Sequence, residues 1–327
     1  MVRKIDWESQ IGRRVKLRDL HVFGTVAQHG SMAQAAAELR VSQPAISEII
    51  SDLEHALDVR LFDRSHQGVV LTVYGQSLLK RTTVVFDELK QSIRDLEFLS
   101  DPTVGELLIG CPESIAASIL PPIVQRFSQQ YPRVVLQVKH VTSPPIRLPE
   151  LRERKLDLIL QRLSNPLAVE ADDLNVELLF DDEMIIAAGV HTRWARRRKI
   201  DLAELVDEPW ILMPPDSWNY RTLQSAFRAR GLDMPSTCTV TFSVHLRLAL
   251  LATGPFVTVF PKSFVSLNAS RLALKVLPVD LPVRPWPVAI ITLRNRILTP
   301  VTQLFIDQVR AFAKSVAADM KPGQNPG

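Results

Sequence analysis

The stretch "SMAQAAAELRVSQPAISEIISDLE", residues 31–54, constrains this chain more than any other, because it predicts two short helices joined by a tight turn. Ser42 stands where a helix N-cap belongs, and Pro44 falls in the first turn, where its missing N–H costs no hydrogen bond. Apolar residues then recur at helical spacing, with polar residues on the other faces. This pattern indicates a helix-turn-helix unit or, on periodicity alone, an ordinary helical hairpin.

The next residues predict a hairpin and then a long helix. Residues 58–72, "DVRLFDRSHQGVVLT", place a glycine between short β-branched pieces, which favours a two-stranded wing. Residues 72–100 contain no proline, and their apolar residues repeat at heptad spacing. Such a stripe either pairs two copies of the helix or packs the helix on its own domain. Its members are Leu79, Phe86, Leu89, Ile93 and Leu96, with Thr82 as a polar member.

Beyond a linker at residues 100–106, strands alternate with helices, which predicts mostly parallel sheets covered by helices. The alternation occurs in two sets, so we expect two lobes with a cleft between them. Hydrophobic content of 46% and a net charge of +4 are ordinary for a globular protein, and no apolar run reaches membrane-spanning length. The N-terminus lacks the apolar core of a secretory signal, and the two cysteines, Cys111 and Cys238, show no metal-binding spacing. These features favour a cytoplasmic protein.

Residues 23–79 resemble the winged helix-turn-helix of the LysR-type transcriptional regulators. The motifs A-A-x-x-L, S-Q-P-A-I-S, L-E, L-F-x-R and L-T-x-x-G occur at the family's spacing. The resemblance implies a mainly α N-terminal domain, a long linker helix and an α/β effector domain with two lobes, like that of periplasmic binding proteins. The expected boundaries are an N-terminal extension (1–16), the winged helix-turn-helix (17–72), the linker and dimerisation helix (73–103), the effector-binding domain (104–318; lobe I about 104–176 and 284–318, lobe II about 177–283) and a disordered tail (319–327).

The resemblance assigns DNA contacts to the second helix of the pair and to the wing. Gln43, Pro44 and Ser47 would face bases in the major groove, where a glutamine can pair with adenine. Arg64 and the wing would hold phosphates, which sets register rather than sequence. The predicted DNA-binding residues are Ser42, Gln43, Pro44, Ser47, Glu48, Ser51, Arg64, Ser65 and His66.

Acidic side chains in the second helix depart from the family's usual composition. Glu48 stands where many members carry a base, and Asp52 and Glu54 follow it. Residues 1–65 hold as many acidic as basic side chains, so we expect weak nonspecific attraction to phosphates. Glu48 either points to solvent or pairs with an arginine, or it accepts a hydrogen bond from a cytosine amino group.

In this family a small molecule binds between the lobes, beside helix N-termini and hydroxyl groups at strand ends. Helix N-termini bind anions, and Trp218 either stacks on a planar ligand or packs as a structural aromatic. The resemblance therefore favours a small carboxylate, a sugar or an aromatic acid as effector. The predicted effector-binding residues are Ser114, Thr142 and Ser143 on one wall, and Ser217, Trp218 and Asn219 on the other.

The implied function is that of a ligand-responsive, sequence-specific transcriptional regulator without enzymatic activity, cofactor or metal. Its partners would be double-stranded DNA with an interrupted palindrome, the effector, and further copies of the chain in dimers and tetramers. RNA polymerase is an additional candidate partner, and no membrane is expected. The alternatives are a redox-sensing regulator that uses Cys111, an enzyme, and a solute-binding protein. Phosphate-binding glycine loops, G-x-S-x-G and H-E-x-x-H, which would support an enzyme, do not occur in the sequence.

Overall fold

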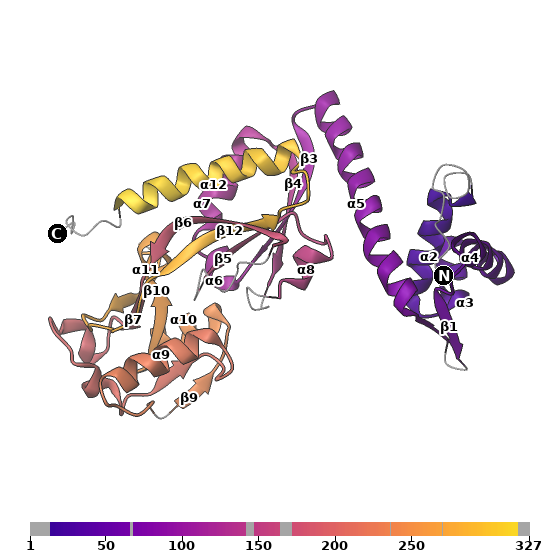
Figure 1. The fold of residues 1–327 in the computed structure, drawn as a ribbon. Helices are drawn as coiled ribbons and strands as arrows, with labels where there is room; N and C mark the ends of the chain where they lie inside the picture. Colours follow the sequence, from indigo (N-terminus) through magenta and orange to yellow (C-terminus); the bar gives the residue numbers. More distant parts are fainter. Residues whose placement is uncertain are drawn as a thin grey trace. The chain divides into compact units, whose positions relative to one another are not determined.

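The computed structural model describes residues 14–65, 68–141, 147–163, 172–235, 237–269 and 271–319. The chain divides into two compact units between Ile93 and Arg94, inside a long helix. Figure 1 shows a small helical domain that leads into the long helix α5, and a larger domain built on two sheets. In the described residues, no helix combines the length and the apolar character that a membrane crossing requires.

The first unit is a helical domain with a two-stranded hairpin. Its elements are α2 (Leu17–His29), α3 (Met32–Leu39), α4 (Gln43–Leu57), β1 (Phe62–Ser65), β2 (Gly68–Leu71) and the start of α5 (Val73–Ser100). Arg40 ends α3 in the left-handed conformation, at φ 55°, so the chain turns sharply before α4. Phe23, Ile46 and Ile50 are fully buried in one core that all three short helices share. This arrangement confirms the helix-turn-helix prediction.

The L-T-x-x-G motif joins the wing to α5. The Thr72 hydroxyl donates a hydrogen bond to the Arg60 carbonyl at 2.7 Å. The hydroxyl oxygen of Thr72 also accepts the Gly75 N–H at 3.1 Å. A Cβ on Gly75 would lie 2.2 Å from the Leu61 carbonyl oxygen, so only glycine permits this close approach. The motif thus fixes the point at which α5 leaves the hairpin.

The second unit contains two five-stranded sheets. The lobe I sheet has the order β4-β3-β5-β12-β6, and the lobe II sheet has the order β11-β7-β10-β8-β9. Their strands are β3 (Val104–Cys111), β4 (Arg133–His140), β5 (Leu158–Arg162), β6 (Leu174–Asp182), β7 (Met184–Gly189), β8 (Trp210–Leu212), β9 (Thr237–Val240), β10 (Val257–Pro261), β11 (Leu274–Val276) and β12 (Trp286–Leu293).

Helices cover both sheets, as expected for a doubly layered α/β domain. The helices of lobe I are α6 (Glu113–Ala116), α7 (Leu120–Gln130), α8 (Pro149–Arg152) and α12 (Pro300–Asp319). Those of lobe II are the 3₁₀ helices η3 (Arg193–Arg196) and η4 (Leu202–Leu205), with α9 (Trp218–Ala229), α10 (Val244–Thr253) and α11 (Lys262–Leu267). The two-lobed prediction is confirmed, although β12 runs antiparallel to both of its neighbours.

The crossing between the lobes differs from the expected boundary. The sequence suggested that lobe II begins near residue 177, but β6 stays in the lobe I sheet through Asp182. The chain enters the lobe II sheet with β7 at Met184. The difference arises because only Glu183 separates the end of β6 from the start of β7, so no linker in the sequence marks the crossing.

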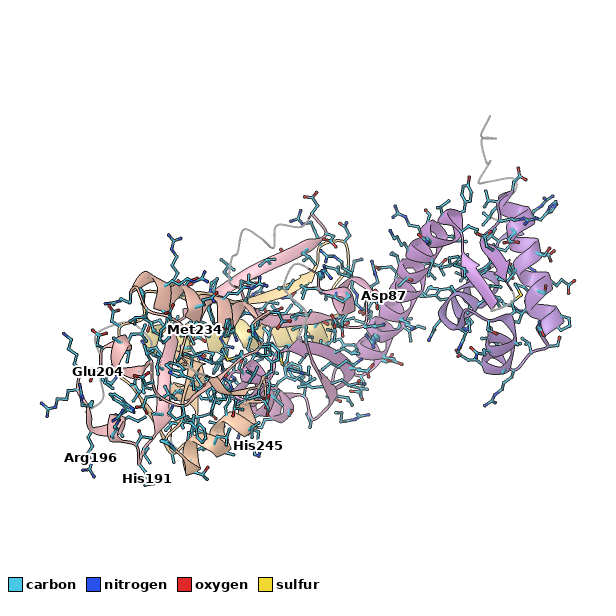
Figure 2. All side chains as sticks on the ribbon, turned by 90° about the horizontal axis from the view of Figure 1, so that it is seen from below. Asp87, His191, Arg196, Glu204, Met234 and His245 are labelled. Carbon is cyan, nitrogen blue, oxygen red and sulfur yellow. The ribbon has the colours of Figure 1, made fainter. Side chains whose placement is uncertain are left out.

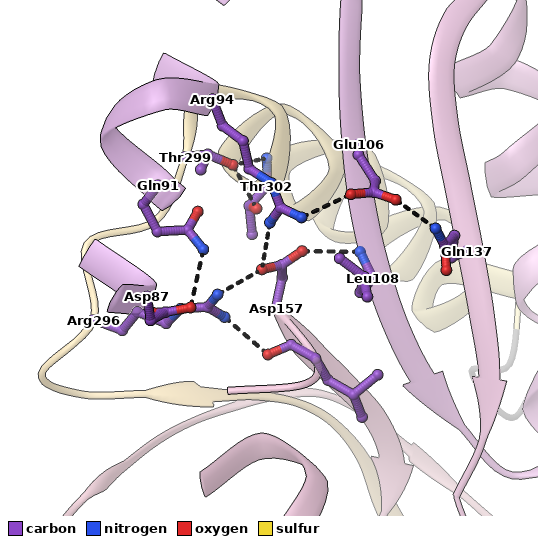
Figure 3. Close-up of polar contacts among 11 residues, drawn as sticks. Asp87, Gln91, Arg94, Glu106, Leu108, Gln137, Asp157, Arg296, Thr299 and Thr302 are labelled. Atoms are coloured by element: carbon purple, nitrogen blue, oxygen red, sulfur yellow. Dashed lines mark hydrogen bonds and ion pairs between the residues drawn. The ribbon is translucent and has the colours of Figure 1, made fainter. Parts of the chain in front are cut away.

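Asp157 connects several segments of the second unit (Figure 3). Its carboxylate accepts the Leu108 N–H at 2.9 Å and forms ion pairs with Arg296 at 3.0 Å and with Arg94 at 3.6 Å. Arg94, near the end of α5, also donates to Glu106 at 2.7 Å. The last turns of α5 are therefore anchored to the lobe I sheet by charge-assisted hydrogen bonds.

Candidate DNA-binding surface and effector cleft

The first turn of α4 presents polar side chains to solvent. The Ser42 Oγ accepts the Ala45 N–H at 3.4 Å and caps the helix, with Pro44 in the first turn. Gln43 and Pro44 are exposed, and Ser47 is half-buried. Glu48 and Ser51 are exposed as well, whereas the apolar stripe of the same helix is buried. The predicted base-contacting residues of α4 therefore share an accessible surface at its N-terminal end.

One of the acidic residues of α4 has a structural role. The Glu54 carboxylate accepts the N–H groups of Leu61 and Phe62, at 2.6 and 3.1 Å, and so ties α4 to the start of the wing. Asp52 is exposed on the helix surface. The acidic character of α4 is thus explained at Glu54 by a hydrogen-bonded contact within the domain.

The wing carries the remaining predicted DNA contacts. β1 and β2 pair antiparallel, with Arg64 opposite Val69 and Ser65 opposite Gly68. The Val69 N–H also donates to the Gly30 carbonyl at 2.9 Å, which holds the hairpin against the end of α2. His66 lies outside the described residues. The backbone thus places Arg64 and Ser65 at the end of β1, where the wing begins to turn.

The apolar stripe of α5 divides into two parts. Leu79 packs against the core of the helical domain, and the Phe86 ring lies 5.6 Å from the His21 ring of α2. Thr82, between them, is buried. Further along, Leu89, Ile93 and Leu96 are 40%, 57% and 63% exposed. The first part of the stripe therefore packs on its own domain, and pairing through the exposed part stays a prediction.

The second candidate site lies between the lobes. In lobe I the parallel strands β3, β4 and β5 end at Cys111, His140 and Arg162, and in lobe II the parallel strands β8, β9 and β10 end at Leu212, Val240 and Pro261. Hydrogen bonds between residues that follow these ends join the two edges, as described below. Ligands of α/β proteins commonly bind at the carboxyl ends of parallel strands.

A buried ion pair of lobe I is hydrogen-bonded to lobe II beside these strand ends. Arg162 Nε donates to Asp182 at 2.8 Å, and both side chains are almost fully buried. The other guanidinium nitrogens donate to Ser114 of lobe I and to Ser263 of lobe II, both at 3.1 Å. The N–H and the hydroxyl of Ser263 both donate hydrogen bonds to the Asp182 carboxylate, at 2.9 and 2.6 Å. The predicted effector residue Ser114 is therefore a member of an interlobe network.

A second interlobe contact involves Glu113 and the start of α10. The Glu113 carboxylate accepts the Val244 N–H at 2.9 Å and the His245 N–H at 3.3 Å. The His245 side chain itself lies at the surface (Figure 2). Nearby, Asn268 donates to the Ala117 carbonyl at 3.1 Å and adds a third connection. The two lobes thus meet through polar groups.

The other predicted effector residues have mixed positions. Ser217 caps α9 and accepts the Tyr220 N–H at 3.2 Å. Trp218 packs against the lobe II core, with its ring 4.0 Å from that of Trp286 at the start of β12. The buried Oδ1 of Asn219 has no hydrogen-bond partner among the described residues. Thr142 and Ser143 lie outside the described residues.

Cys111 does not have the surroundings of a redox sensor. Its side chain is 1% exposed, and burial raises the pKa of its thiol to about 12. Because the thiolate is the reactive form, such a thiol reacts slowly with oxidants at neutral pH. In the described part of the chain, no three His, Cys, Asp or Glu side chains gather as a metal site.

Sequence reasoning missed Glu113, Asp182 and Ser263. Each of them ends a strand or follows the end of one, and this position is the only local pattern that could have marked them as site residues. Their partners lie 20–132 positions away in the chain, so no local pattern could have paired them.

Comparisons with known proteins agree with this architecture. Residues 17–76 match the bacterial regulatory helix-turn-helix proteins of the lysR family, and residues 100–314 match the LysR substrate binding domain. The regulator YdcI of Escherichia coli (strain K12) is 28% identical over 303 residues, 92% of this chain and 97% of its own. The regulator GbpR of Azospirillum brasilense is 27% identical over 299 residues, 91% of this chain and 86% of its own.

Solved structures show the same fold. Full-length CbnR in complex with its target DNA has a TM-score of 0.62 at 21% identity and covers 91% of this chain and 100% of its own. A full-length variant of OxyR from Pseudomonas aeruginosa has a TM-score of 0.64 at 23% identity and covers 95% of this chain and 99% of its own. This chain therefore belongs to the LysR family and is a ligand-responsive, DNA-binding transcriptional regulator.

Proposed function

We propose that α4 enters the major groove and contacts bases through Gln43, Pro44 and Ser47. The observation that carries this proposal is the accessible polar first turn of α4, which stands on a buried apolar stripe. A helix held in this way can present short side chains to base edges, where donors and acceptors distinguish all four base pairs. Ser42, Glu48 and Ser51 border this surface and are the further candidates on α4.

The wing would hold the DNA backbone. Arg64 and Ser65 end β1, and His66 follows them. An arginine at this position neutralises a phosphate charge and sets the register of α4 without selecting a sequence. The wing would therefore contribute affinity, and α4 would contribute specificity.

We further propose that Leu89, Ile93 and Leu96 pair α5 with the same helix of a second chain. Their exposure leaves an apolar strip without cover in the single chain. A two-fold dimer would set two copies of α4 against two half-sites, which explains the choice of an interrupted palindrome as target. Pairing of effector domains would then give a tetramer.

The interlobe cleft would hold a small effector, for which a carboxylate, a sugar and an aromatic acid are the candidates. An effector that binds one arrangement of the lobes more tightly shifts the population of the DNA-bound assembly toward that arrangement. The regulator would act in the cytoplasm, contact RNA polymerase at the promoter and catalyse no reaction of its own.

The DNA proposal is tested by binding measurements on the promoter fragment upstream of the gene, with unrelated DNA as reference. Ser47→Ala should lower the specific-to-nonspecific affinity ratio by roughly 2–10-fold, the value of one hydrogen bond. Arg64→Ala should weaken binding to all sequences alike. It should also reduce the slope of log affinity against log salt concentration by about one, the value of one phosphate contact. His55→Ala, exposed at the end of α4, is the matched control and should change neither quantity.

Equal effects of the Ser47 and Arg64 substitutions on the affinity ratio would contradict the division of roles. Absence of any preference for the upstream fragment over unrelated DNA at moderate salt would contradict the choice of target.

A further inference from the structure

The positive charge of this chain is concentrated in lobe II and not in the helix-turn-helix domain. Residues 184–285, from the start of β7 to the residue before β12, hold thirteen Lys and Arg against seven Asp and Glu. Residues 1–100 hold thirteen of each kind, so this part of the chain is neutral. Attraction between a protein and DNA phosphates grows with the number of phosphates that basic side chains neutralise. The N-terminal part as a whole therefore supplies little of this attraction.

Five of the thirteen bases of lobe II lie in one short stretch, residues 193–199, which we call the basic segment. It starts in the 3₁₀ helix η3 and ends just before Ile200. Trp194 and Ile200 are 4% and 3% exposed and pack in the core of lobe II, so they anchor the segment near both of its ends. All five basic side chains are exposed, and Figure 2 shows Arg196 at the surface. The fold thus holds these bases in contact with solvent.

Two arginines of the basic segment are held by lobe II itself. Arg193 forms an ion pair with Glu208, and its guanidinium carbon lies 4.7 Å from the centroid of the Trp194 ring. Arg197 forms an ion pair with Glu204 at 2.9 Å. These carboxylates compensate much of the charge of the two arginines. They also show that the segment accommodates anionic oxygens, the kind of acceptor that a guanidinium binds best.

The other three bases of the segment are uncompensated. In the part of the chain that the structure describes, no side chain accepts a hydrogen bond from Arg196, Arg198 or Lys199. The backbone is extended at Arg197, with φ −76° and ψ 139°, so these three side chains follow one another along the surface. A row of exposed positive charges of this kind attracts a polyanion.

The chemistry of the segment favours double-stranded DNA over a protein partner. Protein–protein interfaces have an apolar centre rich in aromatic residues, but the large apolar residues of this stretch are buried. Protein–DNA interfaces are more polar and much more positive, and arginine pairs well with phosphate. Binding of single strands relies on aromatic rings on which bases stack, and the Trp194 ring is covered. The phosphate backbone of a duplex therefore fits the segment best.

We propose that the basic segment is a second DNA-contacting surface, which binds phosphates of double-stranded DNA without reading their sequence. This inference goes beyond the proposed contacts of α4 and the wing. The segment would add nonspecific affinity to a chain whose N-terminal part is neutral, while α4 would still select the sequence.

The inference is tested on the full chain with unrelated double-stranded DNA, whose affinity is measured at several salt concentrations. Arg196→Ala combined with Arg198→Ala removes two uncompensated charges. The slope of log affinity against log salt concentration should fall by about two, because each phosphate contact contributes roughly 0.9. Arg221→Ala combined with Arg228→Ala removes two exposed arginines of α9 in the same lobe and should leave the slope unchanged. Both double variants change exposed side chains only, so their unfolding temperatures should match that of wild type.

Two results would overturn the inference. An unchanged slope in the Arg196 and Arg198 variant would leave an acidic protein surface as the partner of the segment. An equal fall in both double variants would assign the effect to the overall charge of lobe II.

The outcome is independent of the proposal for α4. The Arg196 and Arg198 variant should keep the specific-to-nonspecific affinity ratio of wild type, whereas Ser47→Ala should lower that ratio and keep the salt slope on unrelated DNA. Each proposal can therefore fail while the other stands.

Discussion

The carboxylate of Glu54 makes its contacts within the folded domain and is not part of the exposed polar surface at the start of α4. It accepts two backbone N–H groups at the point where the chain leaves α4 and starts the wing. Hydrogen bonds to an ionised acceptor are about twice as strong as neutral ones. A negative charge on the helix that we propose contacts DNA is therefore compatible with DNA binding when backbone N–H groups of the same domain stabilise it locally.

Removal of this carboxylate should affect stability and leave selectivity intact. Glu54→Ala leaves the N–H groups of Leu61 and Phe62 without their acceptor, which should lower the free energy of unfolding by about 1–3 kcal/mol. Chemical denaturation followed by circular dichroism measures this loss. Asp52→Ala, which removes an exposed carboxylate of the same helix, should have almost no effect. A change in base selectivity of Glu54→Ala at a temperature where it stays folded would instead place this side chain at the DNA.

At the scale of elements, α5 carries two kinds of apolar contact along one stripe. Its first turns are bound to the helical domain through Gly75 and Leu79, and Leu89, Ile93 and Leu96 remain exposed. The heptad pattern in the sequence is continuous. It therefore predicts the apolar stripe but cannot tell which part of the stripe is buried and which part is exposed. The division depends on α2, which covers Phe86 and ends the buried part.

A charge in the exposed part should separate the chains without unfolding them. Ile93 is 57% exposed, so Ile93→Glu should leave the melting curve of the single chain nearly unchanged. In a paired helix the same glutamate would be buried, and we expect the dimer to weaken by about tenfold or more. Sedimentation at several protein concentrations measures this shift. Lys80→Glu, exposed at a position of α5 that does not flank the stripe, serves as the control and should remain associated like wild type.

At the scale of the whole chain, the polar groups that join the two lobes differ in burial. Arg162 and Asp182 are 3% and 0% exposed, whereas the His245 end of the Glu113 contact is open to solvent. Removal of one partner from a buried ion pair leaves a charge without compensation, while an exposed contact exchanges more easily with water or ligand. The effector domain thus combines a buried polar network with a contact that is more open to solvent.

Asp182→Asn tests the contribution of the buried network to stability. The substitution keeps the shape of the side chain but leaves the Arg162 guanidinium buried without its counter-charge, so the free energy of unfolding of the effector domain should fall by about 3–5 kcal/mol. Urea denaturation followed by tryptophan fluorescence measures this loss. Asp280→Asn, at the exposed pair with Arg230, is the matched control and should cost little. Equal losses in both variants would show that the buried pair contributes no special stability.

Sequence patterns anticipated the parts of the molecule whose interactions are local. The cap at Ser42, the stripe through Ile46 and Ile50, and the alternation of strands and helices all depend on residues close together in the chain. The cleft depends on contacts such as Glu113 with Val244, which only the completed fold brings together. The family resemblance predicted Ser114 as an effector-binding residue but could not predict its hydrogen bond to Arg162.

The position of β12 has a consequence for the order in which the chain folds during synthesis. β12 lies between β5 and β6 in the lobe I sheet, yet it follows all of lobe II in the sequence. Trp286 stands directly opposite Asp182, so lobe II enters and leaves through neighbouring strand positions, as an inserted domain does. On the ribosome, lobe II can therefore complete its sheet while lobe I still lacks a central strand. Lobe I closes last, and a chain that stops before residue 286 exposes the edges of β5 and β6, which makes it prone to aggregation.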